Sequence, residues 1–438
     1  MEADARPDGR SNGRKNKLTD TIYALSSGAP PAAVAVVRVS GPKADTALAA
    51  LAGALPEPRT ARLARLRDGT QVVDNALIIR FPGPASATGE DVAELHLHGG
   101  RSVVAATLAA LGRIDGLRPA EPGEFTRRAF ENGRIDLAEA EGLADLLEAE
   151  TESQRRAALA LAGGALSRQV AVWQRELLGL AARVEAALDF SDEDDVAPLP
   201  PDFAARLACL RDELTSWLAR PPAERLKEGI RVVIAGPPNA GKSSLLNALV
   251  GRDAAITSAI PGTTRDLIEA PAAFGGIPFL LIDTAGLRES PDEIEAIGVD
   301  RARGSAAAAD ILLWLGEPGE APRQAILVHA KADLGPALDP SDISVSAVTG
   351  QGLEALIRLL IQHSASLLPR EGEVALNGRQ RAALAAAAGA LEAAVAEADM
   401  LVTAELLRNA RNAFDRITGR AGVENMLDAL FGRFCIGK

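Results

Sequence analysis

The feature that most constrains this chain is a glycine-rich loop between an apolar run and a helical pattern. Residues 236–243 read Gly-Pro-Pro-Asn-Ala-Gly-Lys-Ser and match the phosphate-binding pattern G-x-x-x-x-G-K-[ST] at every fixed position. The apolar run 232–235 predicts a buried strand before the loop, and residues 244–250 predict a helix after it. Backbone N–H groups in such a loop surround phosphates, and the helix N-terminus adds partial positive charge. The sequence therefore predicts an α/β nucleotide-binding domain.

A second apolar run, 280–282, ends in Asp283. We expect Asp283 to hold Mg²⁺ through water and the Gly286 amide to sense the γ-phosphate. In the first loop, Lys242 can reach the β- and γ-phosphates and the Ser243 hydroxyl can ligate Mg²⁺. Residues expected to contact the nucleotide in these two segments are Asn239, Ala240, Gly241, Lys242, Ser243, Ser244, Asp283, Thr284, Ala285 and Gly286.

A third segment, residues 329–333, reads His-Ala-Lys-Ala-Asp. Asp333 offers two acceptor oxygens to the N–H groups of guanine, and adenine presents no such pair of donors. Together the three segments predict a GTPase. Ala330 stands where this element normally begins with Asn, and losing one hydrogen bond costs about 0.5–1.5 kcal/mol, so we expect weak affinity with guanine preference retained. The residues expected around the base are Lys331, Asp333, Ser346 and Ala347.

Composition narrows the class of protein. A chain of 438 residues is long enough for several domains, and its hydrophobic content of 47 % is ample for their cores. The two cysteines, Cys209 and Cys435, exclude a disulfide framework and a cysteine zinc site and fit a reducing cytoplasm. The net charge of −12 excludes nonspecific nucleic-acid binding by the whole molecule. No apolar run is long enough to cross a membrane, and the polar residues 1–18 predict a disordered tail.

The segment before these motifs, residues 19–133, predicts an α+β domain. Alternating hydrophobicity over 92–98 places Glu94, His96 and His98 on one face of a strand. A metal site and a solvated or interface face are both consistent with that arrangement. The expected strands are 33–41, 75–81 and 92–100, and the expected helices are 42–55 and 102–111.

The remaining segments show apolar residues at helical spacing. We interpret the chain as a helical domain, 134–228 plus 369–438, with the GTPase domain 229–368 inserted in it; two separate helical domains are the alternative. The fold class is thus multi-domain: α+β, all-α and α/β. Helices are expected over 135–188 with a break at Gly163-Gly164, and over 203–218, 379–407, 410–417 and 423–431.

A set of ordered motifs carries a resemblance to a known family. The chain resembles the MnmE (also called TrmE) family of bacterial tRNA-modification GTPases from residue 20 to residue 438. The motifs are Arg38-Val39-Ser40-Gly41, Phe81-Pro82-Gly83-Pro84, Thr88-Gly89-Glu90-Asp91-Val92, His98-Gly99-Gly100, Arg118-x-x-x-Pro122-Gly123-Glu124-Phe125-Thr126, Asp136-Leu137-Ala138-Glu139-Ala140-Glu141, Gly262-Thr263-Thr264-Arg265-Asp266, Asp283-Thr284-Ala285-Gly286-Leu287-Arg288-Glu289 and Phe434-Cys435-Ile436-Gly437-Lys438.

The resemblance implies a larger reaction. In this family the N-terminal domain forms a homodimer and binds a tetrahydrofolate derivative, the 5-formyl or 5,10-methylene form. With MnmG, an FAD enzyme, the family installs an aminomethyl or carboxymethylaminomethyl group on carbon 5 of the wobble uridine of certain tRNAs; a heterotetramer is expected. Arg134 replaces the usual Lys, so that contact keeps its charge but changes geometry. The matching folate positions are Arg38, Glu94, Arg134 and Lys438.

The family also implies a role for K⁺. From the residues alone, Leu287 stands where Ras-type proteins place a water-orienting Gln, and no arginine finger is evident. A monovalent cation can supply the missing positive charge. By resemblance, Glu295 orients the water, Thr264 and Ser243 ligate Mg²⁺, and the K⁺ ligands are Asn239, Ser258, Ile260 and Thr263.

Cys435 and the overall function leave alternatives open. Cys435 can be a nucleophile, an acid or a packed thiol; a reactive thiol needs exposure and a positive environment. A regulatory switch that binds RNA or ribosomes, without one-carbon chemistry, is the alternative to the modification enzyme. An ATP-dependent P-loop enzyme fits poorly, because the guanine-reading Asp333 follows its strand.

Overall fold

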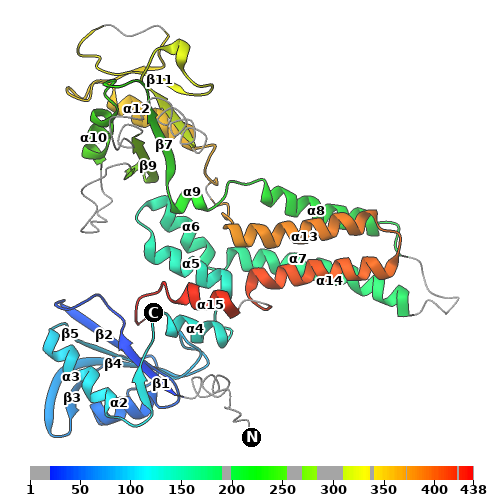
Figure 1. Ribbon diagram of the computed structural model, residues 1–438. Coiled ribbons are helices and arrows are strands. Elements are labelled where there is room, and N and C mark those ends of the chain that lie inside the picture. Colours follow the sequence, from blue (N-terminus) through cyan, green and yellow to red (C-terminus); the bar gives the residue numbers. More distant parts are fainter. Residues whose placement is uncertain are drawn as a thin grey trace, which may run out of the picture. The chain divides into compact units, whose positions relative to one another are not determined.

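The structure is a computed structural model that describes residues 20–189, 199–253, 269–283, 309–335, 340–370, 372–421 and 424–437. The chain divides into two compact units. The first contains the described parts of 1–144 and 418–438, and the second contains those of 145–417 (Figure 1). The second unit holds both a helical bundle and an α/β sheet. The domain boundaries predicted from the sequence within it stay predictions.

The first unit is built on a six-stranded sheet of order β3-β4-β5-β2-β1-β6. Neighbouring strands are antiparallel except β1 and β6, which are parallel. The sequence pattern predicted β2, β4 and β5 but missed β1, β3 and the short β6. The strands are β1 (Thr21–Leu25), β2 (Val34–Ser40), β3 (Arg62–Asp68), β4 (Gln71–Phe81), β5 (Val92–His98) and β6 (Leu117–Pro119).

Helices α2 (Ala44–Ala52) and α3 (Arg101–Gly112) pack against this sheet. Leu48 of α2 and Leu111 of α3 join Leu95 of β5 in one buried cluster. Successive strand residues alternate between buried and partly exposed positions, as Val92–His98 illustrates. One face of the sheet therefore carries the core, and the other carries polar side chains together with exposed hydrophobic ones.

A second cluster in this unit joins segments far apart in the sequence. Helices α4 (Glu124–Glu131) and α15 (Glu424–Phe431) lie close together with the start of α5 (Leu137–Glu148). Leu137 and Phe431 are buried in this cluster together with Phe434 near the C-terminus. The C-terminal segment is thus an integral part of the first unit.

The second unit contains a bundle in which α7, α8, α13 and α14 run side by side (Figure 1). Trp173 of α7 anchors it, with its ring centroid 5.1 Å from Trp217 and 5.9 Å from Phe414. The predicted break at Gly163-Gly164 is confirmed, because it separates α6 from α7. The helices are α6 (Glu152–Ala162), α7 (Ala165–Asp189), α8 (Phe203–Leu218), α13 (Gly378–Ala396) and α14 (Met400–Thr418).

The predicted helix breaks after residue 378 are wrong. The sequence pattern favoured one helix over 379–407 and a new one from 410, whereas α13 ends at Ala396 and α14 runs from Met400 through both positions. The physical reason is local capping. The Asp399 carboxylate accepts a hydrogen bond from the Leu401 N–H at 2.8 Å and satisfies a donor at the helix start. Because Ala, Glu and Asp are all compatible with helix, apolar spacing alone did not locate this cap.

The α/β part of the second unit is a six-stranded sheet of order β12-β11-β10-β7-β9-β8. All neighbouring strands are parallel except β8, an antiparallel edge. The confirmed fold class therefore comprises α+β, all-α and α/β parts. The elements are α9 (Glu224–Lys227), β7 (Ile230–Ala235), α10 (Lys242–Asp253), β8 (Glu269–Phe274), β9 (Ile277–Asp283), β10 (Ile311–Trp314), the 3₁₀ turn Pro318–Glu320, β11 (Ile326–His329), β12 (Ile343–Ser344) and α12 (Leu353–Ser364).

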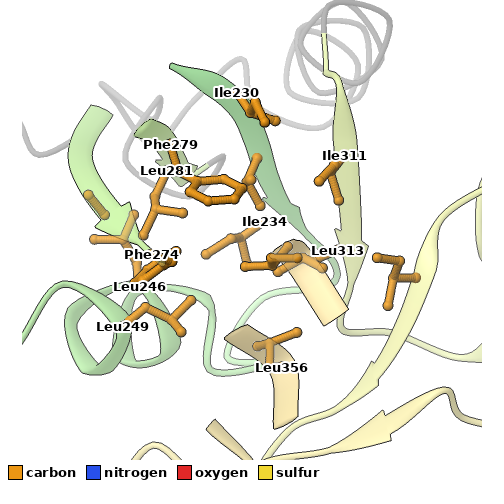
Figure 2. Packing of buried hydrophobic residues seen from close by; sticks show 14 of the residues in the cluster. Ile230, Ile234, Leu246, Leu249, Phe274, Phe279, Leu281, Ile311, Leu313 and Leu356 are labelled. Atoms are coloured by element: carbon orange, nitrogen blue, oxygen red, sulfur yellow. The ribbon is translucent and has the colours of Figure 1, made fainter. Parts of the chain in front are cut away.

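The core of this sheet is continuous from strand to helix. Figure 2 shows Ile234 of the central strand among Leu313 of β10, Leu246 of α10 and Leu356 of α12, all members of one buried cluster. Strands covered by helices are expected as unbroken apolar runs, and residues 230–235 have that composition. Across the described ranges, none of the helices is both long and apolar enough to cross a membrane.

Candidate nucleotide and carboxylate-ligand sites

The phosphate-binding pattern forms the connection from β7 to α10. Gly236 has φ +148°, and a Cβ there would lie 3.1 Å from the carbonyl carbon of Leu315, so a side chain would force the loop outward. Gly241, with φ +99°, ends the loop immediately before α10. The structure thus places the loop at the carboxyl end of a central parallel strand, where α/β proteins bind phosphorylated ligands.

Lys242 and Ser243 lie at the start of α10. Lys242 is 7 % exposed, and its ammonium group donates to the carbonyl oxygens of Gly236 at 3.0 Å and Pro237 at 2.8 Å. The Ser243 hydroxyl donates to a carboxylate oxygen of Asp283, which is 3 % exposed at the end of β9. A hydroxyl beside a carboxylate is the oxygen-rich environment that Mg²⁺ prefers. These residues therefore fit a Mg²⁺–nucleotide.

The segment predicted to read guanine, residues 329–333, lies against the phosphate loop. Lys331 donates from Nζ to the carbonyl oxygen of Asn239 at 2.7 Å. Both residues have positive φ, +62° and +59°, in a region that costs side-chain-bearing residues energy. A Cβ on Gly241 would lie 3.9 Å from that of Ala330. The loop and residues 330–333 thus form one continuous surface.

The segment containing Ser346 completes this surface. Ser346 is fully buried, and its hydroxyl accepts a hydrogen bond from the Thr349 N–H at 3.1 Å. The Ala332 N–H donates to the Val345 carbonyl at 3.0 Å, which joins the two segments predicted to contact the base. Asp333 is exposed, so its carboxylate is accessible to a ligand; its predicted contact with guanine stays a prediction.

Several predicted site residues lie outside the described ranges, and their predicted roles stay predictions. Among them are the expected water-orienting residue and most of the expected K⁺ ligands. They are Ser258, Ile260, Thr263, Thr264, Thr284, Ala285, Gly286, Glu295 and Lys438.

In the first unit, Arg38 and Glu94 form an ion pair. They are direct neighbours on β2 and β5, and Nε and Nη2 of Arg38 donate to one Glu94 oxygen at 3.0 and 2.9 Å. The other Glu94 oxygen lies 3.2 Å from His96 Nε2. The Arg38 guanidinium also lies 5.7 Å from the ring centroid of Phe125. Two residues predicted from the family resemblance are therefore held together by sheet register.

A cavity of about 330 Å³ opens beside Glu94. Arg134 lines the same cavity. Three of the four residues predicted to bind folate, Arg38, Glu94 and Arg134, therefore lie in one region. Sequence reasoning assigned no role to Arg59, which belongs to none of the motifs, or to Phe81, which belongs to the motif Phe81-Pro82-Gly83-Pro84. The lining residues are Arg59, Phe81, Ala85, Ser86, Ala87, Val92, Glu94 and Arg134.

The loop 82–91, which contributes to the cavity wall, is held at several points. Asn132 donates from Nδ2 to the Thr88 carbonyl at 2.8 Å. Arg128, only 2 % exposed, donates to both Glu90 carboxylate oxygens at 3.1 Å. These contacts hold the loop in place, so this part of the cavity wall is largely preorganised before a ligand binds.

Glu124 stabilises the same region electrostatically. Burial opposes its ionisation, but hydrogen bonds from Arg118 and from the Glu121 N–H, together with the charges of Arg118 and Arg128, outweigh burial and lower the pKa of Glu124. The same pairing raises the pKa of Arg118 above its usual value. This part of the first unit is therefore built on ionised partners at neutral pH.

The metal interpretation of Glu94, His96 and His98 receives no support. His98 Nδ1 lies 2.7 Å from an Asp74 carboxylate oxygen, and His96 Nε2 lies 3.2 Å from a Glu94 carboxylate oxygen. Within the part of the chain that the structure describes, no group of three His, Cys, Asp or Glu side chains could hold a metal ion. These side chains instead form polar pairs on the sheet.

The C-terminal tail packs onto β1. Gly437 has φ +100°, and a Cβ there would lie 2.1 Å from the Leu25 carbonyl oxygen, so only glycine fits this approach. Cys435, two residues earlier, is exposed. The packed-thiol interpretation of Cys435 is therefore wrong, whereas its chemical role stays a prediction.

Comparisons with known proteins agree along the chain. The model described as "MnmE helical domain" matches residues 137–435, and "GTP-binding protein TrmE N-terminus" matches residues 21–134. The tRNA modification GTPase MnmE of Rhizorhabdus wittichii is 62 % identical over 427 residues, 96 % of this chain and 97 % of that protein. The protein of the same name from Erythrobacter litoralis is 59 % identical over 423 residues, 96 % of this chain and all of that protein. On this evidence the chain belongs to the MnmE (TrmE) family.

Proposed function

We propose that this chain is a GTP-hydrolysing enzyme that acts in tRNA modification. One observation carries the proposal: Lys242, Ser243 and Asp283 meet at the carboxyl edge of the parallel sheet. That is the donor set for a Mg²⁺–nucleoside triphosphate. The relatives named tRNA modification GTPase MnmE align with the chain over almost its whole length, which supports the link to tRNA.

Each residue has a distinct task in hydrolysis. Lys242 contacts the β- and γ-phosphates and stabilises charge that develops between them. Ser243 ligates Mg²⁺ with Thr264, and Asp283 holds the ion through water. Asp333 accepts hydrogen bonds from guanine. Glu295 orients the attacking water by accepting a hydrogen bond from it.

We place K⁺ in the same site. Leu287 cannot orient water or supply charge, so the site needs a cation from another source. Asn239 supplies one ligand, and the others come from Ser258, Ile260 and Thr263. The position of Asn239 in the phosphate loop, fixed by the hydrogen bond from Lys331, supports this assignment.

The first unit is proposed to bind the one-carbon donor, a 5-formyl or 5,10-methylene tetrahydrofolate. The cavity beside Glu94 supports this, because its carboxylate can accept from the N–H donors of a pterin. Arg38, Arg134 and Lys438 add positive charge for the ligand's acidic groups. When bound, the folate would supply a one-carbon unit that Glu94 orients, with Cys435, whose thiol is exposed, acting as acid or nucleophile.

Two partners and a location complete the proposal. An MnmG-type FAD protein joins the chain in a heterotetramer, and together they install the aminomethyl or carboxymethylaminomethyl group on carbon 5 of the wobble uridine.

A homodimer forms through the open face of the first sheet, where Leu63 on β3 and Leu77 on β4 are direct neighbours and both are exposed. Exposed apolar neighbours favour burial against a partner. A cytoplasmic location fits a reaction on tRNA.

The proposal is tested in cells that lack their own copy of the gene. We expect the wild-type chain to restore the wobble-uridine modification, measured by mass spectrometry of tRNA nucleosides. Lys242→Ala and Glu94→Gln should each fail, because the first removes the ammonium group that binds phosphate and the second replaces one acceptor oxygen and the negative charge with an NH₂ donor. Arg411→Met, an exposed change on α14 outside both sites and outside the proposed dimer face, is the control. Full restoration by Glu94→Gln would favour a regulatory switch without one-carbon chemistry.

A further inference from the structure

Arg59 has an unusual backbone conformation beside the cavity. Its φ is +60°, in the left-handed region that non-glycine residues rarely adopt. The conformation is held by a hydrogen bond from the Arg59 N–H to the Arg80 carbonyl at 2.9 Å. Strained residues cluster at ligand sites, where the surrounding structure holds a side chain in place. The strand that follows, β3, does not require this conformation.

The Arg59 side chain is directed along the cavity wall by two contacts. Its guanidinium lies 5.7 Å from the Phe81 ring centroid, and Nη2 donates to the Ala85 carbonyl oxygen. A guanidinium has five N–H donors, so most of them are available to a ligand. Across the described ranges, Arg59 pairs with no carboxylate. Arg59 is therefore a cation that lies against the Phe81 ring and has N–H donors left to bind a ligand.

The charges around the cavity favour an acidic ligand. Glu94 is already neutralised by Arg38 at 2.9 Å. Arg134, like Arg59, forms no ion pair with the described residues. Two cations thus face the cavity without an acidic partner, whereas the single carboxylate has one. At about 330 Å³, the space is within the range of small-molecule sites.

We propose that Arg59, supported by Phe81, is a specificity-determining residue that binds the glutamate carboxylates of the folate ligand. Arg59 offers a planar pair of donors to a carboxylate, the geometry that guanidinium groups recognise best. Glu94 accepts from the pterin N–H groups at the other end of the ligand. This inference rests on the folate part of the proposed function and extends it to the part of the ligand that carries the glutamate.

A purely structural role would give Arg59 a different signature. Its bond to Ala85 helps to hold the loop 82–91, so losing it could weaken the binding of any ligand in the cavity. Such an effect would not depend on whether the ligand carries glutamate. A pair of ligands that differ only in that group therefore separates recognition from support.

The experiment measures binding to the full chain by isothermal titration calorimetry. The probes are 5-formyl-tetrahydrofolate with one glutamate and the primary amide of 5-formyl-tetrahydropteroate, which lacks the glutamate and carries no carboxylate. The variants are Arg59→Met and Arg59→Lys. Arg411→Met is the matched control, because Arg411 is exposed on α14 and lies outside both the cavity and the proposed dimer face. Thermal melting of each variant shows whether the fold is kept.

Arg59→Met should weaken binding of the glutamate-bearing folate about ten-fold and leave binding of the pteroate amide unchanged. Arg59→Lys should recover part of the loss, because it keeps charge without the planar fork. Equal loss for both ligands, or none for either, overturns the inference and leaves the folate site standing. A wild-type chain that binds neither ligand overturns both.

Discussion

The two sheets of this chain form their candidate sites in different ways. The sheet around β7 (Ile230–Ala235) is parallel and covered by helices, and its site lies in loops that follow strand ends. The sheet of the first unit is mainly antiparallel and open on one face, and its site uses side chains on the strands themselves. Parallel sheets bind ligands beyond the carboxyl ends of strands, because both faces are occupied. An open face allows paired charges such as Arg38 and Glu94 to take part directly.

The difference implies that the two sites can be disabled separately. The largest expected effect is from Lys242→Ala, which removes the ammonium group held in the phosphate loop. Preorganised charge of this kind contributes about 100-fold or more to rate. GTP hydrolysis, measured by phosphate release, should fall by at least that factor while folate binding is unchanged. Lys43→Ala, in the first unit, is the control. Joint loss of both activities would contradict separate sites.

Glu94→Gln should have the opposite effect. It removes the charge that pairs with Arg38, and it replaces one of the two carboxylate oxygens proposed to accept from pterin N–H groups with an NH₂ donor. Losing one charge-assisted hydrogen bond costs about 2 kcal/mol, or roughly 30-fold in affinity. Binding of 5-formyl-tetrahydrofolate, followed by calorimetry, should weaken by that amount, and GTP hydrolysis should not change. Unaltered folate affinity would remove Glu94 from the site.

Acid should weaken the first unit through Glu124. The folded-state pKa of Glu124 lies below the usual 4.5, so its stabilising effect is complete above that value and is lost as pH falls through the folded pKa. Glu124→Gln should lower stability at pH 7 by about 1.5 kcal/mol and flatten the decline below pH 4.5. Thermal melting across pH 3 to 7 measures both. If the variant loses stability between pH 4.5 and pH 3 as steeply as the wild type does, other carboxyl groups cause that loss.

The smallest effect is expected from Ala330→Asn. Ala330 is half-buried beside the phosphate loop, and an amide there can restore one hydrogen bond to guanine. Such a bond contributes about 0.5–1.5 kcal/mol, so affinity for GDP should rise roughly 2- to 10-fold. Fluorescent-nucleotide titration measures the change, with ADP as the reference. A matching rise for ADP would show that the new side chain does not read guanine.

The same comparison explains what the sequence could predict. The phosphate loop is contiguous, so residues 236–243 and the later Asp283 predicted the nucleotide site directly. The cavity of the first unit combines Arg59, Glu94 and Arg134, which only the sheet register and the held loop bring together. The unusual backbone of Arg59 leaves no trace in composition or spacing. Without the family resemblance, no residue pattern pointed to this cavity.

The fold shows the same limit. Strong alternation predicted β5 (Val92–His98), and unbroken apolar runs predicted β7. The strand β3 (Arg62–Asp68) was missed, because its outward arginines interrupt the apolar pattern. The helix α14 was divided wrongly, because the cap at Asp399 was not recognised. Elements with strong periodicity were predictable, and those defined by tertiary pairing or a single cap were not.

The most direct test is GTP hydrolysis by the purified chain in KCl and in NaCl at equal ionic strength, with GTP in large excess to offset the effect of Ala330. Strong stimulation by K⁺, lost in Asn239→Ala, is the predicted result, because a bound K⁺ supplies charge that Leu287 cannot. Equal rates in the two salts would contradict a K⁺-dependent site and would leave the parallel sheet with a different catalytic device.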